Sequence, residues 1–267
     1  MSTAKKKPST FQNIFAGLAI VILFIIAEVF FHVFLGDEAN FEMKDGHPYP
    51  KNIFGTIYMG GAVVPFLITC LLVVITFSIE RFITITAASG KGSVTNFVYK
   101  VKGLLAENDI QGAIEACDKQ KGSVGNVVKS VLETYKAMLT DNTKDKEQKI
   151  AAITKEQEDA TALEMPMLEK NLTIIATLAS VSTLIGLLGT VIGMIKAFSS
   201  MSGGGAAAAA QLAVGISEAL INTATGIGAS ALAIIAYNYF TSKIDELTYN
   251  IDEISYSILQ NFNAQVK

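Results

Sequence analysis

Residues 172–198 read LTIIATLASVSTLIGLLGTVIGMIKAF, residues 212–240 read LAVGISEALINTATGIGASALAIIAYNYF, and these two apolar stretches decide the fold. Each is longer than the roughly 20 residues that an α-helix needs to cross the hydrocarbon core of a bilayer. The segment between them, 199–211, is short and rich in glycine and alanine. The sequence therefore predicts two membrane-spanning helices joined by a turn.

Small and hydroxyl side chains recur along one face of each predicted helix. In the first stretch, steps of three and four residues align Thr183, Gly186, Thr190, Gly193 and Ala197. In the second, the same spacing aligns Glu218, Asn222, Thr225 and Ala229. A carboxylate inside a membrane helix costs on the order of 3 kcal/mol to insert, so Glu218 is expected to face protein or water. The two helices are thus predicted to line a polar path within a helix assembly.

The polar side chains of this stripe each have a structural and a functional interpretation. The Thr190 and Thr223 hydroxyls can donate and accept hydrogen bonds, which suits a proton relay, yet membrane threonines often bond to their own helix. Glu218 is either a titrating group or a structural anchor. Asn222 lies one turn below Glu218 and is placed to hold it, and Thr225 extends the stripe. We expect Lys196, near the end of the first stretch, to reach the membrane surface.

Glycines on these helices are expected to serve packing. Small residues let the backbones of two membrane helices approach closely. The glycines to which we assign this role are Gly186, Gly189, Gly193 and Gly226.

Composition excludes several classes of protein. Hydrophobic residues make up 51% of the 267-residue chain, which is typical of membrane proteins. The net charge of −3 and the absence of a basic stripe argue against a nucleic-acid partner. The two cysteines and two histidines lack metal-ligand spacing, and no nucleophile–base arrangement is present. We therefore predict no metal site, no cofactor and no catalytic residues.

The whole chain is expected to be all-α, with four membrane spans. The predicted segments are a basic arm at 1–10, a first span at 11–35, an outer loop at 36–53, a second span at 54–79 that Pro65 interrupts, a helical domain at 80–170, a third span at 171–198, a turn at 199–211, a fourth span at 212–240 and an amphipathic helix at 241–267. Lysines concentrate in 80–170, which places that domain, and with it both termini, in the cytoplasm by the positive-inside rule.

The first predicted span admits another interpretation. A basic arm followed by an apolar run also describes a signal peptide, but this run is long and lacks an A-x-A-like exit. We favour a retained helix. Glu28 and His32 lie four residues apart on it, near its outer end, where they are placed to pair. The pair is either an interfacial contact or part of an ion-uptake path.

The predicted helical domain contains four helices, near 93–107, 109–119, 124–140 and 146–170. Asn108 is expected to act as a cap between the first two helices, and Gly122 and Gly125 to act as helix breakers. We expect the last helix to continue into the third span, with a bend at Pro166.

Two motifs resemble the ExbB/TolQ/MotA family of ion-driven motor proteins, and within it the ExbB proteins. Residues 184–194, LIGLLGTVIGM, are similar to the family's LLGLLGTVxGM motif, and residues 215–223, GISEALINT, to its GIxEAL segment. The approach to the third span matches as well, through Glu164, Leu168, Glu169, Lys170 and Leu172. Thr183 stands where the family usually has proline. The resemblance covers residues 54–262 and is specific in the two motifs.

The resemblance implies a homo-pentamer in the bacterial inner membrane, whose third and fourth spans enclose a pore. In the family, single-span ExbD-type helices inside the pore carry the proton-accepting aspartate, and a TonB-like protein transmits the work. Thr190 and Thr223 match family threonines that line the cavity. The alternatives are a TolQ-like motor and, from another class, a non-conducting membrane scaffold. Whether H⁺ or Na⁺ is used stays open.

Overall fold

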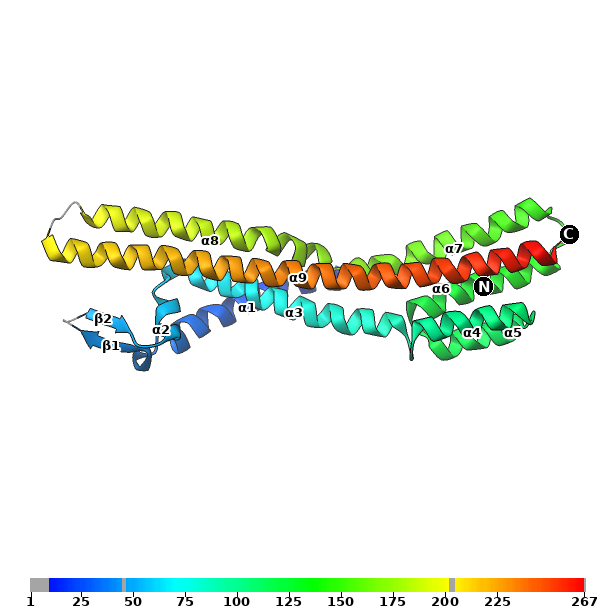
Figure 1. Cartoon of the computed structure of the whole chain (residues 1–267), viewed down its shortest axis with the longest axis horizontal. Coiled ribbons are helices and arrows are strands. Elements are labelled where there is room, and N and C mark those ends of the chain that lie inside the picture. The colour runs from blue at the N-terminus through cyan, green and yellow to red at the C-terminus, as the bar shows by residue number, and fades with distance from the viewer. Residues whose placement is uncertain (1–9, 45–46, 202–204, 267) are drawn as a thin grey trace. The chain divides into compact units, whose positions relative to one another are not determined.

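The computed structural model describes residues 10–44, 47–201 and 205–266, almost all of them helical (Figure 1). The chain divides into two compact units. The first unit contains the described residues up to Ser78 together with Thr173–Tyr237, and the second contains Ile79–Leu172 and the described residues from Asn238 onward. Helices α3 (Val64–Ser89) and α9 (Gly205–Gln265) contribute residues to both units.

The first unit begins with α1 (Thr10–Val29), which continues as a π-helix over Phe30–Leu35. The short helix α2 (Ile53–Tyr58) and a 3₁₀ turn at Gly61–Val63 precede α3. The second predicted span, 54–79, is therefore broken before Val64, where Gly61 adopts a φ of +72°. Pro65 falls in the first turn of α3, where its missing N–H removes no helical hydrogen bond.

A β-hairpin occupies the segment expected to be a loop and is the exception to an all-α fold. Strand β1 (Phe41–Lys44) pairs antiparallel with β2 (His47–Pro50), after a 3₁₀ turn at Glu38–Asn40. Asn40 is buried, and its Nδ2 donates to the Phe34 carbonyl at 2.7 Å. The Asn52 amide donates in turn to Asn40 Oδ1 at 2.9 Å. These side-chain bonds attach the hairpin to the end of the π-helix.

The rest of the first unit is built by α8 (Leu172–Met201) and the first part of α9, which lie side by side (Figure 1). Both helices follow the apolar stretches that the sequence singled out. Within the described residues, four helical stretches are long and apolar enough to cross a membrane: Gly17–Leu35, Gly61–Ala106, Lys146–Met201 and Ala208–Gln265.

The second unit contains the four helices expected from sequence, each within two residues of its predicted ends. They are α4 (Val94–Ala106), α5 (Ile110–Gln120), α6 (Gly122–Thr140) and α7 (Lys146–Glu169). The end of α9 packs against them through one apolar face, which consists of Ile244, Leu247, Ile251, Ile254, Ile258 and Phe262. The Tyr135 ring contacts the Phe262 ring edge-on at 5.1 Å, and its hydroxyl donates to Asn261 Oδ1 at 2.6 Å.

Two local expectations in this unit are wrong, whereas Asn108 acts as a cap at the end of α4 and not at the start of α5. The cap of α5 is Asp109, whose carboxylate accepts from Gly112 N at 2.8 Å, whereas Asn108 forms the preceding turn with a φ of +59°. Gly125 lies inside α6 instead of interrupting the chain.

The second error concerns the junction between α7 and α8. Helix α7 does not continue into α8, because Asn171 takes a φ of +65° between them, and Pro166 is accommodated inside α7.

A buried arginine marks the end of α7. Arg81, the chain's only arginine, is 1% exposed. Its Nη1 donates to the Met167 and Leu168 carbonyls at 2.9 and 3.0 Å, and its guanidinium pairs with Glu80. The carbonyls of a helix's last turn lack partners within the helix, so Arg81 satisfies groups that burial would otherwise leave unpaired.

Candidate functional site

The candidate site lies where α8 and the first part of α9 approach each other most closely. A Cβ atom on Gly189 would lie 2.5 Å from the Cβ of Asn222, and one on Gly226 would lie 2.7 Å from the Ser182 carbonyl oxygen. A Cβ on Gly193 would lie 2.8 Å from Ala219 N. Real Cβ contacts are longer than this, so these positions require glycine for the two backbones to stay in place.

Two hydroxyls meet between these helices. Thr190 Oγ1 of α8 and Thr223 Oγ1 of α9 are hydrogen-bonded to each other, and either one can be the donor. Thr190 Oγ1 also lies 3.2 Å from the Gly186 carbonyl, to which it can donate. When Thr190 donates to Gly186, Thr223 donates to Thr190; when Thr190 turns to Thr223, the direction reverses. A hydroxyl pair that can reverse its direction is chemically suited to passing a proton.

Glu218 has a partner that the sequence pattern did not indicate. Its carboxylate is buried and accepts from Lys196 Nζ of α8 at 2.6 Å. The Lys196 side chain is 55% exposed, so the ammonium both reaches the edge of the helix pair and compensates the buried carboxylate.

The backbone of Gly61, ahead of α3, lies against the Glu218 carboxylate. A Cβ on Gly61 would lie 2.6 Å from Glu218 Oε1, so this close approach requires a residue without a side chain. The φ of +72° at Gly61 independently favours glycine.

Asn222 is completely buried, and the structure gives it a different partner from the expected one. Its Nδ2 donates to the Gly60 carbonyl at 2.9 Å instead of holding Glu218. Its Oδ1 has no hydrogen-bond partner within the described residues. Together with the contact at Gly61, this bond ties the glycine break before α3 to α9.

The remaining hydroxyls of the stripe are divided between local and inter-helix bonds. Thr225 Oγ1 donates to Ile221 O of its own helix at 2.8 Å. Ser230 Oγ of α9 donates to the Ala179 carbonyl of α8, a contact that the sequence analysis did not identify. Ser182 Oγ is fully buried and has no partner within the described residues. A buried polar group without a hydrogen-bond partner costs free energy in an apolar environment. The face between α8 and α9 therefore carries polar groups that packing alone would not favour.

Metal binding and thiol chemistry were also considered for the described part of the chain. It contains no group of three His, Cys, Asp or Glu side chains that could hold a metal ion. Burial raises the pKa of the Cys117 thiol to about 12, so this thiol is protonated at neutral pH and is a poor nucleophile.

Comparison with known proteins gives one family and several relatives. The family model described as "MotA/TolQ/ExbB proton channel family" matches residues 120–253, half of the chain. The chain is 26% identical over 193 residues to the biopolymer transport protein ExbB of Pseudomonas putida, covering 70% of this chain and 58% of that protein. It is 39% identical over 94 residues to ExbB of Helicobacter pylori, covering 35% of this chain and 64% of that protein.

A relative from another system also matches part of the chain. The chain is 43% identical over 84 residues to the Tol-Pal system protein TolQ of Haemophilus influenzae, covering 32% of this chain and 37% of that protein. All three matches span less than two thirds of the relatives' own length.

Proposed function

Since the chain belongs to the MotA/TolQ/ExbB proton channel family, whose members are subunits of ion-driven motors, we propose that it is an ExbB-like motor subunit of the bacterial inner membrane. In this proposal the chain uses the proton motive force, together with an ExbD-type partner, to energise TonB-dependent transport across the outer membrane. The proposed role is that of a motor subunit and includes no enzymatic activity.

The observation that carries the proposal is the Thr190–Thr223 hydroxyl pair between two apolar helices. A scaffold does not need two hydroxyls that face each other between apolar helices, whereas a proton path needs groups that both donate and accept. The pair of the buried Glu218 carboxylate and the half-exposed Lys196 ammonium supports the same interpretation, because intramembrane charges mark ion pathways by default. The proposed pore-lining residues are Thr190, Thr223, Glu218, Asn222 and Thr225.

The proposed assembly is a ring of five copies around single-span partner helices. No aspartate occurs in 11–35, 54–79, 171–198 or 212–240, which fits the half of the motor that surrounds the proton carrier. One charge moving down the membrane potential releases about 2.3 kcal/mol per 100 mV. That energy would turn the inner helices, and a TonB-like protein would carry the work outward.

The proposed topology has residues 80–170 and 241–267 on the cytoplasmic side, together with the N-terminal arm. The lysines of these segments support this orientation through the positive-inside rule. The segment 36–53, with its hairpin, and the turn 199–211 then lie on the periplasmic side.

Replacing both hydroxyls tests the proposal. The variant T190V/T223V keeps the side-chain volume but cannot relay a proton, so we expect proton uptake to fall by about a hundredfold in vesicles that contain the chain and its partner. Assembly, followed by native mass spectrometry, should be unchanged. The matched control is T177V, because Thr177 Oγ1 donates to Thr173 O of its own helix at 2.7 Å. A double variant that still conducts at the rate of T177V would leave only a packing role for this face, as in a membrane scaffold.

The second candidate function is that of a TolQ-like motor subunit, which the 43% identity to the Haemophilus influenzae protein favours. Complementation separates the two candidates. Expression of this chain with its own partner in a strain without ExbB and ExbD should restore TonB-dependent uptake, and the same pair in a strain without TolQ and TolR should not. The opposite result would move the assignment to TolQ.

A further inference from the structure

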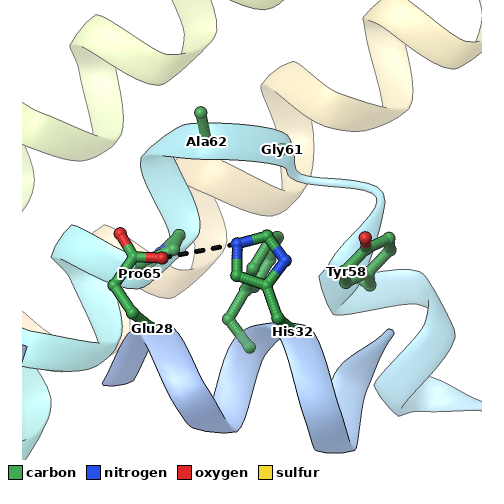
Figure 2. Close-up of a pocket in the computed structure, with 7 residues that line it drawn as sticks. Glu28, His32, Tyr58, Gly61, Ala62 and Pro65 are labelled. Carbon is green, nitrogen blue, oxygen red and sulfur yellow. Dashed lines mark ion pairs between the residues drawn. The ribbon is translucent and has the colours of Figure 1, made fainter. Parts of the chain in front are cut away.

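A second titratable cluster lies outside the site described above. Figure 2 shows the Glu28 carboxylate and the His32 imidazole of the first span pointing toward each other, with His32 Nε2 3.5 Å from Glu28 Oε2. They open into a pocket of about 390 Å³, which is lined by Glu28, Phe31, His32, Tyr58, Gly61, Ala62 and Pro65. A bulk water takes about 30 Å³, so the pocket is large enough for several.

The local backbone is unusual where it presents His32. Residues 30–35 form a π-helix, a rare turn that occurs frequently at functional sites. The Tyr58 ring stacks on the Phe31 ring with centroids 4.6 Å apart. A Cβ on Gly36 would lie 2.8 Å from Tyr58 Cε2, so glycine is needed for the ring to sit there. The wide turn is therefore held by packing from α2.

The wall of this pocket is also the wall of the Glu218 site. Gly61 lines the pocket and, through its missing side chain, lies against the Glu218 carboxylate, where a Cβ would be 2.6 Å from Oε1. The neighbouring Gly60 carbonyl accepts the Asn222 amide. A glycine backbone without side chains thus separates the two titratable groups.

We propose that the Glu28–His32 pair is a proton-uptake site, which takes protons from the aqueous side and delivers them to Glu218 past Gly61. The inference rests on the proposed function and adds to it the place where protons enter the chain. His32 releases the proton from its imidazolium and becomes neutral, water in the pocket carries it, and the Glu218 carboxylate becomes a carboxyl group. Neutralising Glu218 ends its ion pair with Lys196 and leaves an uncompensated ammonium beside the α8–α9 pair.

The charged and titratable groups around this route come from each element packed there. Glu28 on α1 lies 3.5 Å from the His32 imidazole, and Tyr58 on α2 is the phenol that lines the pocket. On the other side of Gly61, Glu218 of α9 is paired with Lys196 of α8. The His32 side chain is 64% exposed and the Glu28 side chain 36%, so the described part of the chain does not cover either group.

The test modifies His32 after the protein has folded. The chain has two histidines, so H47Q leaves His32 as its only one. The H47Q chain is co-purified with its single-span partner, reconstituted in vesicles and driven by a potassium diffusion potential while an interior dye reports proton uptake. We expect diethyl pyrocarbonate, which modifies imidazoles, to lower uptake by about tenfold, and hydroxylamine to restore it.

The control is H32Q/H47Q, which has no histidine in the chain. We expect its uptake to be low before the reagent is added, by about tenfold relative to H47Q, and to stay unchanged afterwards. Equal uptake by H47Q and H32Q/H47Q without reagent overturns the inference, whatever the reagent does to the partner. If H47Q itself takes up no protons, the proposed function fails; if it does so without depending on His32, only this inference fails.

Discussion

Glu218 shows at the scale of one residue how the chain tolerates a carboxylate in an apolar helix. The carboxylate is buried, and its compensation comes from the half-exposed Lys196 of the other helix. Removing one partner of such a pair leaves a buried charge without compensation, which costs more than removing both partners. This asymmetry gives a measurable expectation.

We expect K196M to lower the free energy of unfolding by about 1–3 kcal/mol, because the buried Glu218 carboxylate loses its ion pair with Lys196, which was itself partly solvated. The double variant K196M/E218Q should be more stable than K196M alone, since the uncompensated charge is gone. The measurement is thermal unfolding of the protein in detergent at neutral pH.

The control for this cycle is K243M. Lys243 pairs with Glu246 at 2.7 Å on the surface, and both side chains are about half exposed, so its loss should change stability little. If K196M/E218Q is no more stable than K196M, the Lys196 ammonium is not the group that compensates the buried Glu218 charge.

At the scale of elements, the contact between α8 and α9 depends on positions where a single methyl group decides the packing. A Cβ on Gly189 would meet the Cβ of Asn222 at 2.5 Å, whereas a Cβ on Gly228 of α9 would meet nothing within 4 Å. The two glycines therefore differ in role although both lie in apolar helices.

We expect G189A to separate the two helices, reduce assembly and lower the thermal midpoint, because Asn222 is buried and cannot move aside easily. G228A should be neutral or stabilising by up to about 1 kcal/mol, since alanine favours the helix and finds open space. Thermal unfolding and native mass spectrometry of both variants check this. Equal effects of the two substitutions would rule out close packing as the reason for Gly189.

The elements that sequence predicted well are those whose ends are encoded locally. Helices α4 to α6 begin and end within two residues of the expected positions, and α7 begins at the expected residue, because periodic apolar residues and cap residues act over one turn. The breaks at Gly61 and at Asn171 were missed. Each is stabilised by contacts with residues far away in the chain, such as the Glu218 carboxylate against Gly61 and the Glu80 carboxylate that accepts from the Asn171 amide.

In the candidate site, too, the features encoded along one helix were predicted and the contacts between helices were not. Helical spacing placed Thr190 on one polar stripe and Glu218 on the other, the family resemblance matched Thr190 and Thr223 to cavity-lining threonines, and the structure brings these two hydroxyls together. Spacing along one helix gives no register between two helices, so it did not reveal Lys196 as the partner of Glu218 or the Gly60 carbonyl as the acceptor for Asn222. Those contacts depend on which turns of two helices lie side by side.

At the scale of the whole molecule, exposed apolar side chains on α8 need cover from lipid or from other chains. They include Leu184, Leu187, Leu188, Val191, Ile195 and Phe198. An apolar face this long is consistent with the proposed assembly, in which other chains or lipid cover it.

We expect native mass spectrometry of the chain, co-expressed with the small single-span protein encoded beside it, to show five copies with partner helices bound. The chain expressed alone is the control and should give the ring without them. A monomer in both preparations would contradict the proposed assembly, and a stable ring that never binds a partner would favour a scaffold or a self-contained channel.

Because the sequence has a single arginine, proteolysis at that residue can measure local opening of the fold. A protease specific for arginine has one place to cut, after Arg81, whose side chain is 1% exposed and bonded to the end of α7. Cleavage therefore requires this part of the second unit to open first, and its rate reports the population of that open form. Residues 1–81 and 82–267 would appear as two fragments, so one digestion time course would follow local opening in the native membrane without any label.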